Sequence, residues 1–263
     1  MKIFDSQFDH AVSAGSPYKD IQVPFQWERN FNTIRKDEFV FFTESEYHTS
    51  KTIDHDKKIL WVLESPCFVN ADVVKDLQKN WSSFHKILTH DDRLTHLPNA
   101  MEFPVGGCWI RDEDAKLHKK TKNISLVLSS KNLTYGQSLR HQIAGNNSVD
   151  TYGFNHAPLD QKIEALRDYK FHICIENFKN KKYFTEKIID CFATGTIPIY
   201  WGSADIWLDF DERGIIQVDD YEELESAIKY AKNFEIEDGV IETNFNLSKQ
   251  YWLPETRILS IFG

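Results

Sequence analysis

Short apolar runs alternate with amphipathic segments along the second half of the chain. The runs are apolar almost throughout and only a few residues long, which is typical of strands buried on both faces of a parallel sheet. They cover residues 124–129 (ISLVLS), 170–175 (KFHICI), 197–201 (IPIYW) and 214–218 (GIIQV). Segments with helical spacing separate them, at residues 135–144, 160–169 and 186–193, and a last helix follows Asp220.

The boundaries of these helices carry local signals. Thr185 is a typical N-cap, and Gly195 lies just past the end of the same segment. Asp220 and Glu223 make a capping box for the last helix. The alternation of buried strands and capped helices predicts a doubly wound α/β sheet, in which ligands bind beyond the carboxyl ends of the strands.

The first third of the chain is less regular and richer in aromatic residues. Residues 39–43 (FVFFT) and 59–63 (ILWVL) are typical of buried strands, and residues 72–81 have the spacing of a helix. The polar stretch 111–123 is the best candidate for a linker. We therefore expect two α/β domains, over residues 1–118 and 119–263.

Composition and charge narrow the function. The 263 residues are 41% hydrophobic and 14% aromatic, which is enough to build a folded core. The formal net charge of −9 argues against a nucleic-acid partner, because nothing global would draw the protein to a phosphate backbone. An anionic ligand would need a local cluster of cations.

The sequence carries no clear targeting signal or metal signature. The first ten residues include several polar side chains, and no run of about 18 or more apolar residues occurs. The four cysteines lie far apart without a CxxC pair, which argues against a zinc site and against a disulfide framework. We expect a cytoplasmic protein without a transmembrane segment, with peripheral membrane association left open and the oligomeric state unassigned.

A local cluster of cations follows the apolar run 170–175. Lys179, Lys181, Lys182 and Lys187 lie within nine residues, around the N-cap Thr185. Free backbone N–H groups and the dipole at a helix N-terminus favour an anion, so a diphosphate would fit this arrangement. A solvated lysine loop with ordinary capping explains the same spacing, and the pattern alone does not separate the two interpretations.

A dense motif runs through residues 169–205. It combines an F-x-x-x-x-E-N strand end, a short loop, Y-x-T-E-K, a helix and a P-x-Y-x-G turn. The residues that make it up are Phe171, Glu176, Asn177, Tyr183, Thr185, Glu186, Lys187, Pro198, Tyr200 and Gly202. The segment closely resembles the signature region of the α-1,3/4-fucosyltransferases, glycosyltransferase family 10, and is most similar to the bacterial members.

Weaker similarity to this family extends outward from the motif. The stretch ISLVLSS followed by SLRHQIAGN resembles the first strand and helix of the donor domain, with Arg140 in the place of a phosphate-binding arginine. The stretch LESP at residues 63–66 resembles an element of the acceptor domain, in which Glu64 takes the place of the proposed general base.

The resemblance implies a GT-B architecture, with two Rossmann-like domains facing a cleft. Residues 1–118 would form the acceptor-binding domain, and residues 119–263 the domain that binds the GDP-sugar. The implied reaction is transfer of L-fucose from GDP-fucose to a glycan hydroxyl with inversion, as in an α-1,3-fucosyltransferase. By the same resemblance Glu64 is the base, Arg140 and Lys187 bind the diphosphate, Glu186 takes the ribose hydroxyls, and Asn177 and Tyr183 line the donor site.

Two cations and a helix dipole could replace a metal ion, so we predict a reaction that requires no metal and no cofactor. The spacing of His85, His90 and His96 matches no helical ligand pair, and the acidic triplet at residues 54–56 precedes its strand. Two alternatives stay open: a transferase that uses another GDP-sugar, and a catalytically inactive module that binds a GDP-sugar or a carbohydrate. The acceptor and the linkage position are not predicted.

Overall fold

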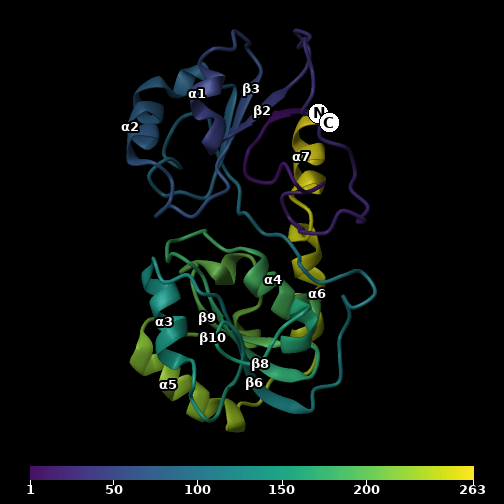
Figure 1. The fold of residues 1–263 in the computed structure, drawn as a ribbon, viewed down its shortest axis with the longest axis vertical. Coiled ribbons are helices and arrows are strands. Elements are labelled where there is room, and N and C mark those ends of the chain that lie inside the picture. Colours follow the sequence, from purple (N-terminus) through teal and green to yellow (C-terminus); the bar gives the residue numbers. More distant parts are fainter. The chain divides into compact units, whose positions relative to one another are not determined.

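The computed structural model describes residues 1–263, which divide into two compact units (Figure 1). The first unit comprises Met1–Val105, Asn180–Tyr183 and Leu253–Gly263. The second unit comprises Gly106–Lys179 and Phe184–Trp252. Each unit is built on its own five-stranded parallel sheet, so the α/β class expected from the sequence is confirmed.

The sheet of the second unit is doubly wound. Its strands run in the order β7-β6-β8-β9-β10, and every neighbouring pair is parallel. The order reverses direction between β6 and β8, where a doubly wound sheet opens to receive a ligand. The strands are β6 (Lys122–Leu128), β7 (Asp150–Gly153), β8 (Tyr169–Ile175), β9 (Ile197–Trp201) and β10 (Ile216–Gln217).

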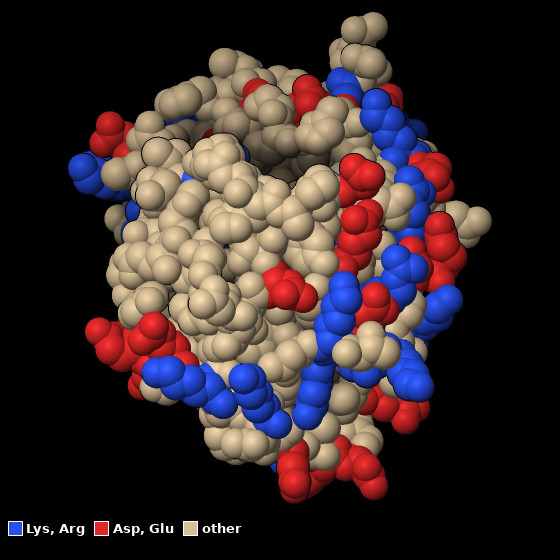
Figure 2. All heavy atoms as spheres, turned by 60° about the horizontal axis from the view of Figure 1, so that its bottom comes forward, with Lys and Arg blue, Asp and Glu red and all other residues tan.

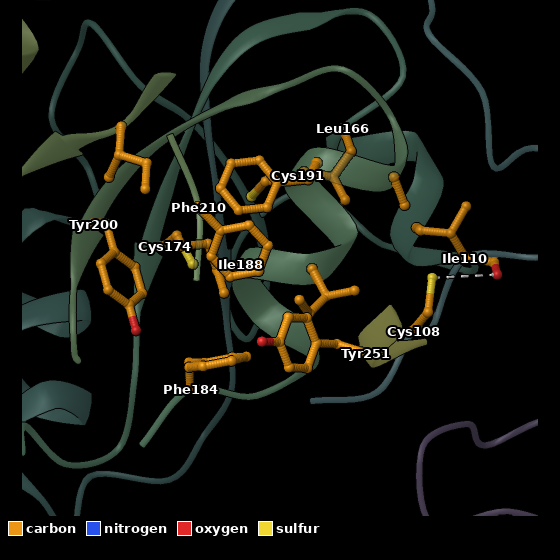
Figure 3. Packing of buried hydrophobic residues seen from close by; sticks show 14 of the residues in the cluster. Cys108, Ile110, Leu166, Cys174, Phe184, Ile188, Cys191, Tyr200, Phe210 and Tyr251 are labelled. Carbon is orange, nitrogen blue, oxygen red and sulfur yellow. Dashed lines mark hydrogen bonds between the residues drawn. The ribbon is translucent and has the colours of Figure 1, made fainter. Parts of the chain in front are cut away.

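Alternation of side chains along β8 divides the core of the second unit into two layers. Phe171 and Ile173 point to the face covered by α3 (Tyr135–Ile143) and α5 (Tyr221–Tyr230). Cys174 points to the opposite face, where it packs against α4 (Glu186–Ala193), as Figure 3 shows. Helix α6 (Val240–Ser248) packs against α4. Helices on both faces explain why these strands are apolar throughout.

The first unit has a simpler topology, because its strands pair in the order in which they occur along the chain. They are β1 (Lys2–Phe4), β2 (Val40–Thr43), β3 (Lys58–Trp61), β4 (Lys86–Thr89) and β5 (Ala100–Glu102). One face of the sheet packs on α1 (Tyr47–Ser50) and α2 (Ala71–Asn80), and the other face packs on an aromatic layer and on α7 (Pro254–Phe262).

The contact-defined units differ from the expected boundary at residue 118. Helix α7 is the last element of the chain, yet it belongs to the first unit because its buried Glu255 is bonded there. The Glu255 carboxylate accepts hydrogen bonds from the Ser13 hydroxyl at 2.6 Å and from the Trp27 indole at 3.0 Å. A buried carboxylate needs such partners, and no local sequence pattern predicts where they lie.

Most of the elements predicted from periodicity are present, but the helix expected over residues 160–169 is wrong. The structure has a single 3₁₀ turn there, Lys162–Ala165. The Asp168 carbonyl accepts hydrogen bonds from the amides of Thr121 and Lys122, at 2.8 Å each. Because these bonds hold the segment against the start of β6, the helical conformation does not continue to residue 169. The predicted strand 214–218 is also shorter than expected, and β1, β4, β5, β7, α1, α6 and α7 were not predicted.

The four cysteines are free, and Cys67 alone is exposed. None of the helices has the length and apolar character needed to span a bilayer. Basic and acidic side chains are interleaved along the margins of the face drawn in Figure 2. With a net charge of −9 for the whole chain, attraction for an anionic ligand must come from local groups within a site.

Candidate functional site

A cavity of about 240 Å³ lies at the switch point of the second sheet. It is bounded by the carboxyl end of β6, by β8, and by residues of α3 and α4, all within the second unit. The side chains that give it chemical character are Trp109, Arg140, Lys162, His172, Glu186 and Lys187. Its place beyond the reversal in strand order is where a doubly wound sheet binds its ligand.

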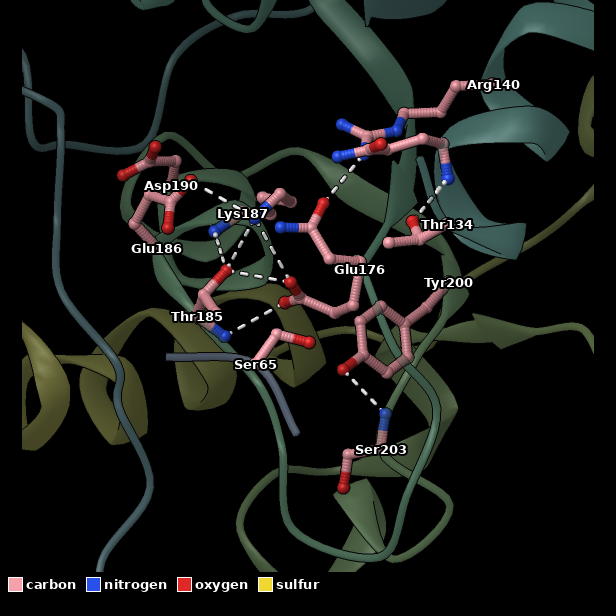
Figure 4. Close-up of polar contacts among 12 residues, drawn as sticks. Ser65, Thr134, Arg140, Glu176, Thr185, Glu186, Lys187, Asp190, Tyr200 and Ser203 are labelled. Carbon is pink, nitrogen blue, oxygen red and sulfur yellow. Dashed lines mark hydrogen bonds and ion pairs between the residues drawn. The ribbon is translucent and has the colours of Figure 1, made fainter. Parts of the chain in front are cut away.

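One buried carboxylate joins the end of β8 to the start of α4 (Figure 4). Glu176 directly follows β8 and is fully buried. Its Oε1 accepts from the Thr185 amide at 2.9 Å, and its Oε2 accepts from the Thr185 hydroxyl at 2.8 Å. Lys187 Nζ lies 3.2 Å from the same Oε2. Since Thr185 is the N-cap of α4, these contacts hold the helix N-terminus against the cavity.

The first turn of α4 carries an ion pair that faces the cavity. Lys187 Nζ lies 3.4 Å from Glu186 Oε1 and 2.9 Å from the Thr185 hydroxyl. Burial acts to raise the pKa of Glu186, but Lys187 and Lys162 outweigh it and hold this pKa at about 2. Burial acts to lower the pKa of Lys187, and the carboxylates of Glu176 and Glu186 outweigh it and raise the value. Both groups are therefore charged at neutral pH.

A second cation lines the same cavity. Arg140 lies on α3, and its Nη2 donates a hydrogen bond to Asn177 Oδ1 at 2.9 Å. Asn177 directly follows Glu176, so one strand end positions both Arg140 and Lys187. A guanidinium and an ammonium beside a helix N-terminus are the groups that bind a diphosphate, while a carboxylate accepts from two neighbouring hydroxyls.

Tyr183, another residue singled out from the sequence, belongs to the first unit. Its ring packs against that of His90, with the centroids 4.9 Å apart. Asn180 ties the same segment down, because its Nδ2 donates to the His90 carbonyl at 3.0 Å and its Oδ1 accepts from the Tyr183 amide at 2.6 Å. These contacts explain why residues 180–183 cluster with the first unit although the motif around them lies in the second.

Glu64 also belongs to the first unit, just beyond β3, and is exposed. A second carboxylate fixes its backbone, since the buried Glu44 accepts from the amides of Leu63 at 2.9 Å and Glu64 at 2.7 Å. Burial raises the pKa of Glu44, and these amides and Gln7 oppose the shift. The loop that carries Glu64 is therefore held by the buried carboxylate of Glu44.

The histidines and acidic triplet considered as metal ligands do not form a metal centre. No group of three or more His, Cys, Asp or Glu side chains is arranged to hold a metal ion.

Sequence reasoning missed several side chains of the cavity. Lys162 is the first residue of the 3₁₀ turn, and Trp109 lies in the irregular segment before β6. Neither residue therefore lies at the end of a strand or at the start of an α-helix. Asp190 does not line the cavity but is the ion-pair partner of Lys162. It lies on the buried face of α4, where periodicity leads one to expect an apolar residue. His172 is one of the core residues of β8, and its chemistry is visible only from its neighbours.

His172 is held as a neutral imidazole. The Ser125 hydroxyl donates its one hydrogen to the Ala165 carbonyl, so it accepts from His172 Nδ1 at 2.8 Å. Burial, and after it the nearby Lys162, lowers the pKa of His172 to about 3. The ring therefore presents no charge to the cavity that it lines.

The fold has solved counterparts, which define its class. The chain is similar to a crystal structure of an alpha1,3-fucosyltransferase, with a TM-score of 0.57 and 20% identity, over 90% of this chain and 79% of that chain. It is also similar to an alpha1,3-fucosyltransferase crystallised with GDP-fucose, with a TM-score of 0.51 and 18% identity over the same shares. With its two parallel sheets, the fold is that of the GT-B glycosyltransferases.

Residues 117–258, more than half of the chain, match the sequence profile of "Glycosyltransferase family 10 (fucosyltransferase) C-term". The chain belongs to this family, and the resemblance seen in the signature motif is confirmed.

Individual relatives match over shorter segments. The alpha-(1,3)-fucosyltransferase FucT of Helicobacter pylori is 42% identical over 91 residues, which cover 34% of this chain and 18% of that protein. The human 4-galactosyl-N-acetylglucosaminide 3-alpha-L-fucosyltransferase 9 is 24% identical over 149 residues, which cover 55% of this chain and 37% of that protein. The chain thus covers less than two thirds of the length of these relatives.

Protonation of His172 should make the second unit sensitive to acid. The pKa of His172 in the folded state, about 3, lies below the ordinary value of 6.5. As the pH falls below 6.5, the unfolded chain therefore binds a proton at this residue while the folded chain does not. The contribution of the neutral His172 to the free energy of unfolding is fully present above about pH 6.5 and decreases toward pH 3. At pH 4 the loss is roughly 3 kcal/mol. His172→Asn should therefore lose less stability than the wild type between pH 7 and pH 4.

The measurement is the melting temperature as a function of pH. His156→Asn, at an exposed position in the same unit, is the matched control and should follow the wild type. Parallel curves for His172→Asn and the wild type would contradict the assignment of a neutral buried ring.

Proposed function

We propose that the protein is an inverting fucosyltransferase, which moves L-fucose from GDP-fucose to a hydroxyl of a glycan acceptor. The observation that carries the proposal is the charged lining of the switch-point cavity, where Arg140, Glu186 and Lys187 meet. Membership of the fucosyltransferase family supports the choice of donor, as does the similarity to an alpha1,3-fucosyltransferase crystallised with GDP-fucose.

Three side chains of the proposed donor site bind different parts of the nucleotide. Arg140 and Lys187 bind the diphosphate, and Glu186 accepts hydrogen bonds from the ribose hydroxyls. Asn177 holds the Arg140 guanidinium through the 2.9 Å hydrogen bond. Tyr183 belongs to the first unit and is not one of the residues that line the cavity. The charge states of Glu186 and Lys187 at neutral pH suit both roles.

The proposed chemistry is a single displacement at the sugar C1. Glu64 takes the proton from the acceptor hydroxyl while the hydroxyl oxygen forms a bond to C1. The bond from C1 to the diphosphate oxygen breaks on the opposite face, and GDP leaves with the bonding electrons. The configuration at C1 is therefore inverted. Arg140, Lys187 and the N-terminus of α4 stabilise the charge that develops on GDP.

A donor panel tests the sugar specificity, because the groups named above act on the nucleotide rather than on the sugar. We expect GDP-fucose to be hydrolysed slowly alone and transferred faster to galactosyl or N-acetylglucosaminyl acceptors, with GDP-mannose inactive. Transfer from another GDP-sugar would replace fucose as the donor. Binding of GDP without turnover of any donor would favour an inactive binding module.

Substitution of the proposed base tests the mechanism. Glu64→Gln keeps the shape of the side chain but removes its ability to take a proton, so kcat for transfer should fall by about 10²–10⁴-fold. The affinity for GDP, measured by calorimetry, should stay unchanged. Glu46→Gln is the matched control and should retain activity. Normal turnover by Glu64→Gln would show that another carboxylate, with Glu44 the first candidate, is the base.

Removal of divalent ions tests whether the cations of the chain suffice for the leaving group. With Arg140, Lys187 and a helix N-terminus at the diphosphate, EDTA should change the transfer rate by less than about twofold. Loss of most activity on chelation, restored by manganese, would contradict metal independence.

A further inference from the structure

A second charged layer lies beside the proposed ribose-binding carboxylate. Lys162, from the 3₁₀ turn, places its Nζ 2.6 Å from Asp190 Oδ2 and 3.7 Å from Glu186 Oε1. The Asp190 side chain is fully buried, and those of Lys162 and Glu186 are each 15% exposed. One ammonium therefore lies between two carboxylates that occupy neighbouring turns of α4.

The anchor of this layer is itself held in place. Asp190 Oδ1 accepts a hydrogen bond from the Trp109 backbone amide at 2.7 Å. The Trp109 ring covers the ammonium, with Lys162 Nζ 5.3 Å from the ring centroid. Lys162 thus has a carboxylate on one side and an aromatic face on another, which leaves its long side chain little freedom.

Electrostatics indicate what the layer does for Glu186. Burial raises the pKa of Asp190 to about 6, and Lys162 opposes the shift. Lys162 is also one of the two cations that keep Glu186 ionised. The other is Lys187, which Glu176, Glu186 and the Thr185 hydroxyl all contact. A diphosphate that binds Lys187 competes with Glu186 for that ammonium, and Lys162 is then the cation that remains at Glu186.

We propose that Lys162, anchored by Asp190, is a positioning residue that orients the Glu186 carboxylate for the ribose hydroxyls while Lys187 is engaged by the diphosphate. This inference rests on the proposed function of the cavity. Lys162 acts on the nucleotide through Glu186. Its loss should therefore weaken specifically the part of the affinity that depends on the ribose hydroxyls.

The experiment compares two ligands across a set of variants. Calorimetry measures the Kd of GDP and of 2′,3′-dideoxy-GDP, which lacks both ribose hydroxyls. The wild type should bind GDP roughly tenfold more tightly than the dideoxy analogue, as expected for hydrogen bonds to a charged group. Lys162→Met should bring this ratio to about one, and Lys162→Arg, which keeps the charge, should restore most of it.

A control and a second variant keep the test decisive. Lys229→Met, at an exposed position on α5, should leave the ratio unchanged. If Lys162→Met does not fold, Lys162→Gln replaces it, because a shorter amide leaves Asp190 a hydrogen-bond donor without the charge. It should lose the ratio in the same way.

The outcomes separate this inference from the proposed function. If Lys162→Met binds GDP and the dideoxy analogue more weakly by the same factor, the ratio of the two Kd values stays unchanged. Lys162 would then have a structural role or act by general charge, and the inference would be overturned. A wild type that binds both ligands equally would overturn it as well, because Glu186 would not read the ribose. Failure of the wild type to bind GDP at all would instead overturn the proposed function.

Discussion

The second unit depends on the buried carboxylate of Glu176. It lies where β8 ends, and it accepts from the amide and hydroxyl of Thr185, the residue that caps α4. A buried carboxylate is stable only with several donors around it, so removal of any partner leaves an expensive unpaired group. The strand end and the helix N-terminus are therefore held together as one rigid corner. The cavity lies at this corner because the strand order reverses there.

Local charge, rather than the charge of the whole chain, makes the site suited to an anion. The chain carries a net charge of −9. At the cavity, Lys162 and Lys187 are paired with the carboxylates of Glu176, Glu186 and Asp190, and Arg140 lines the same cavity. The three carboxylates and three cations make the cluster close to neutral in itself. A diphosphate would complete it, and the preorganised dipoles would need little rearrangement to stabilise a leaving nucleotide.

Much of the second unit could be predicted from the sequence. The apolar runs at β6, β8 and β9 carry their own signal, and so do the cap and end of α4, because these features arise from neighbours along the chain. The signature motif indicated the family, and the family resemblance predicted that Arg140, Glu186 and Lys187 bind the nucleotide. The structure places these three around one cavity.

The rest could not be predicted because it depends on contacts between distant segments. The helix expected over residues 160–169 is replaced by a 3₁₀ turn, since Asp168 bonds to β6. The partners of Lys162 lie on another element, so its part in the site has no local pattern. Tyr183 and α7 join the first unit for the same kind of reason, through His90 and through the partners of Glu255. Tertiary contacts, which are hydrogen bonds, ion pairs and a ring contact, decided these cases.

A crystal structure of the protein with GDP would show where the nucleotide binds. We expect the two phosphates at Arg140 and Lys187, beside the N-terminus of α4, with the ribose hydroxyls on Glu186. A nucleotide bound elsewhere on the protein, or a switch-point cavity that stays empty at saturating GDP, would contradict this expectation.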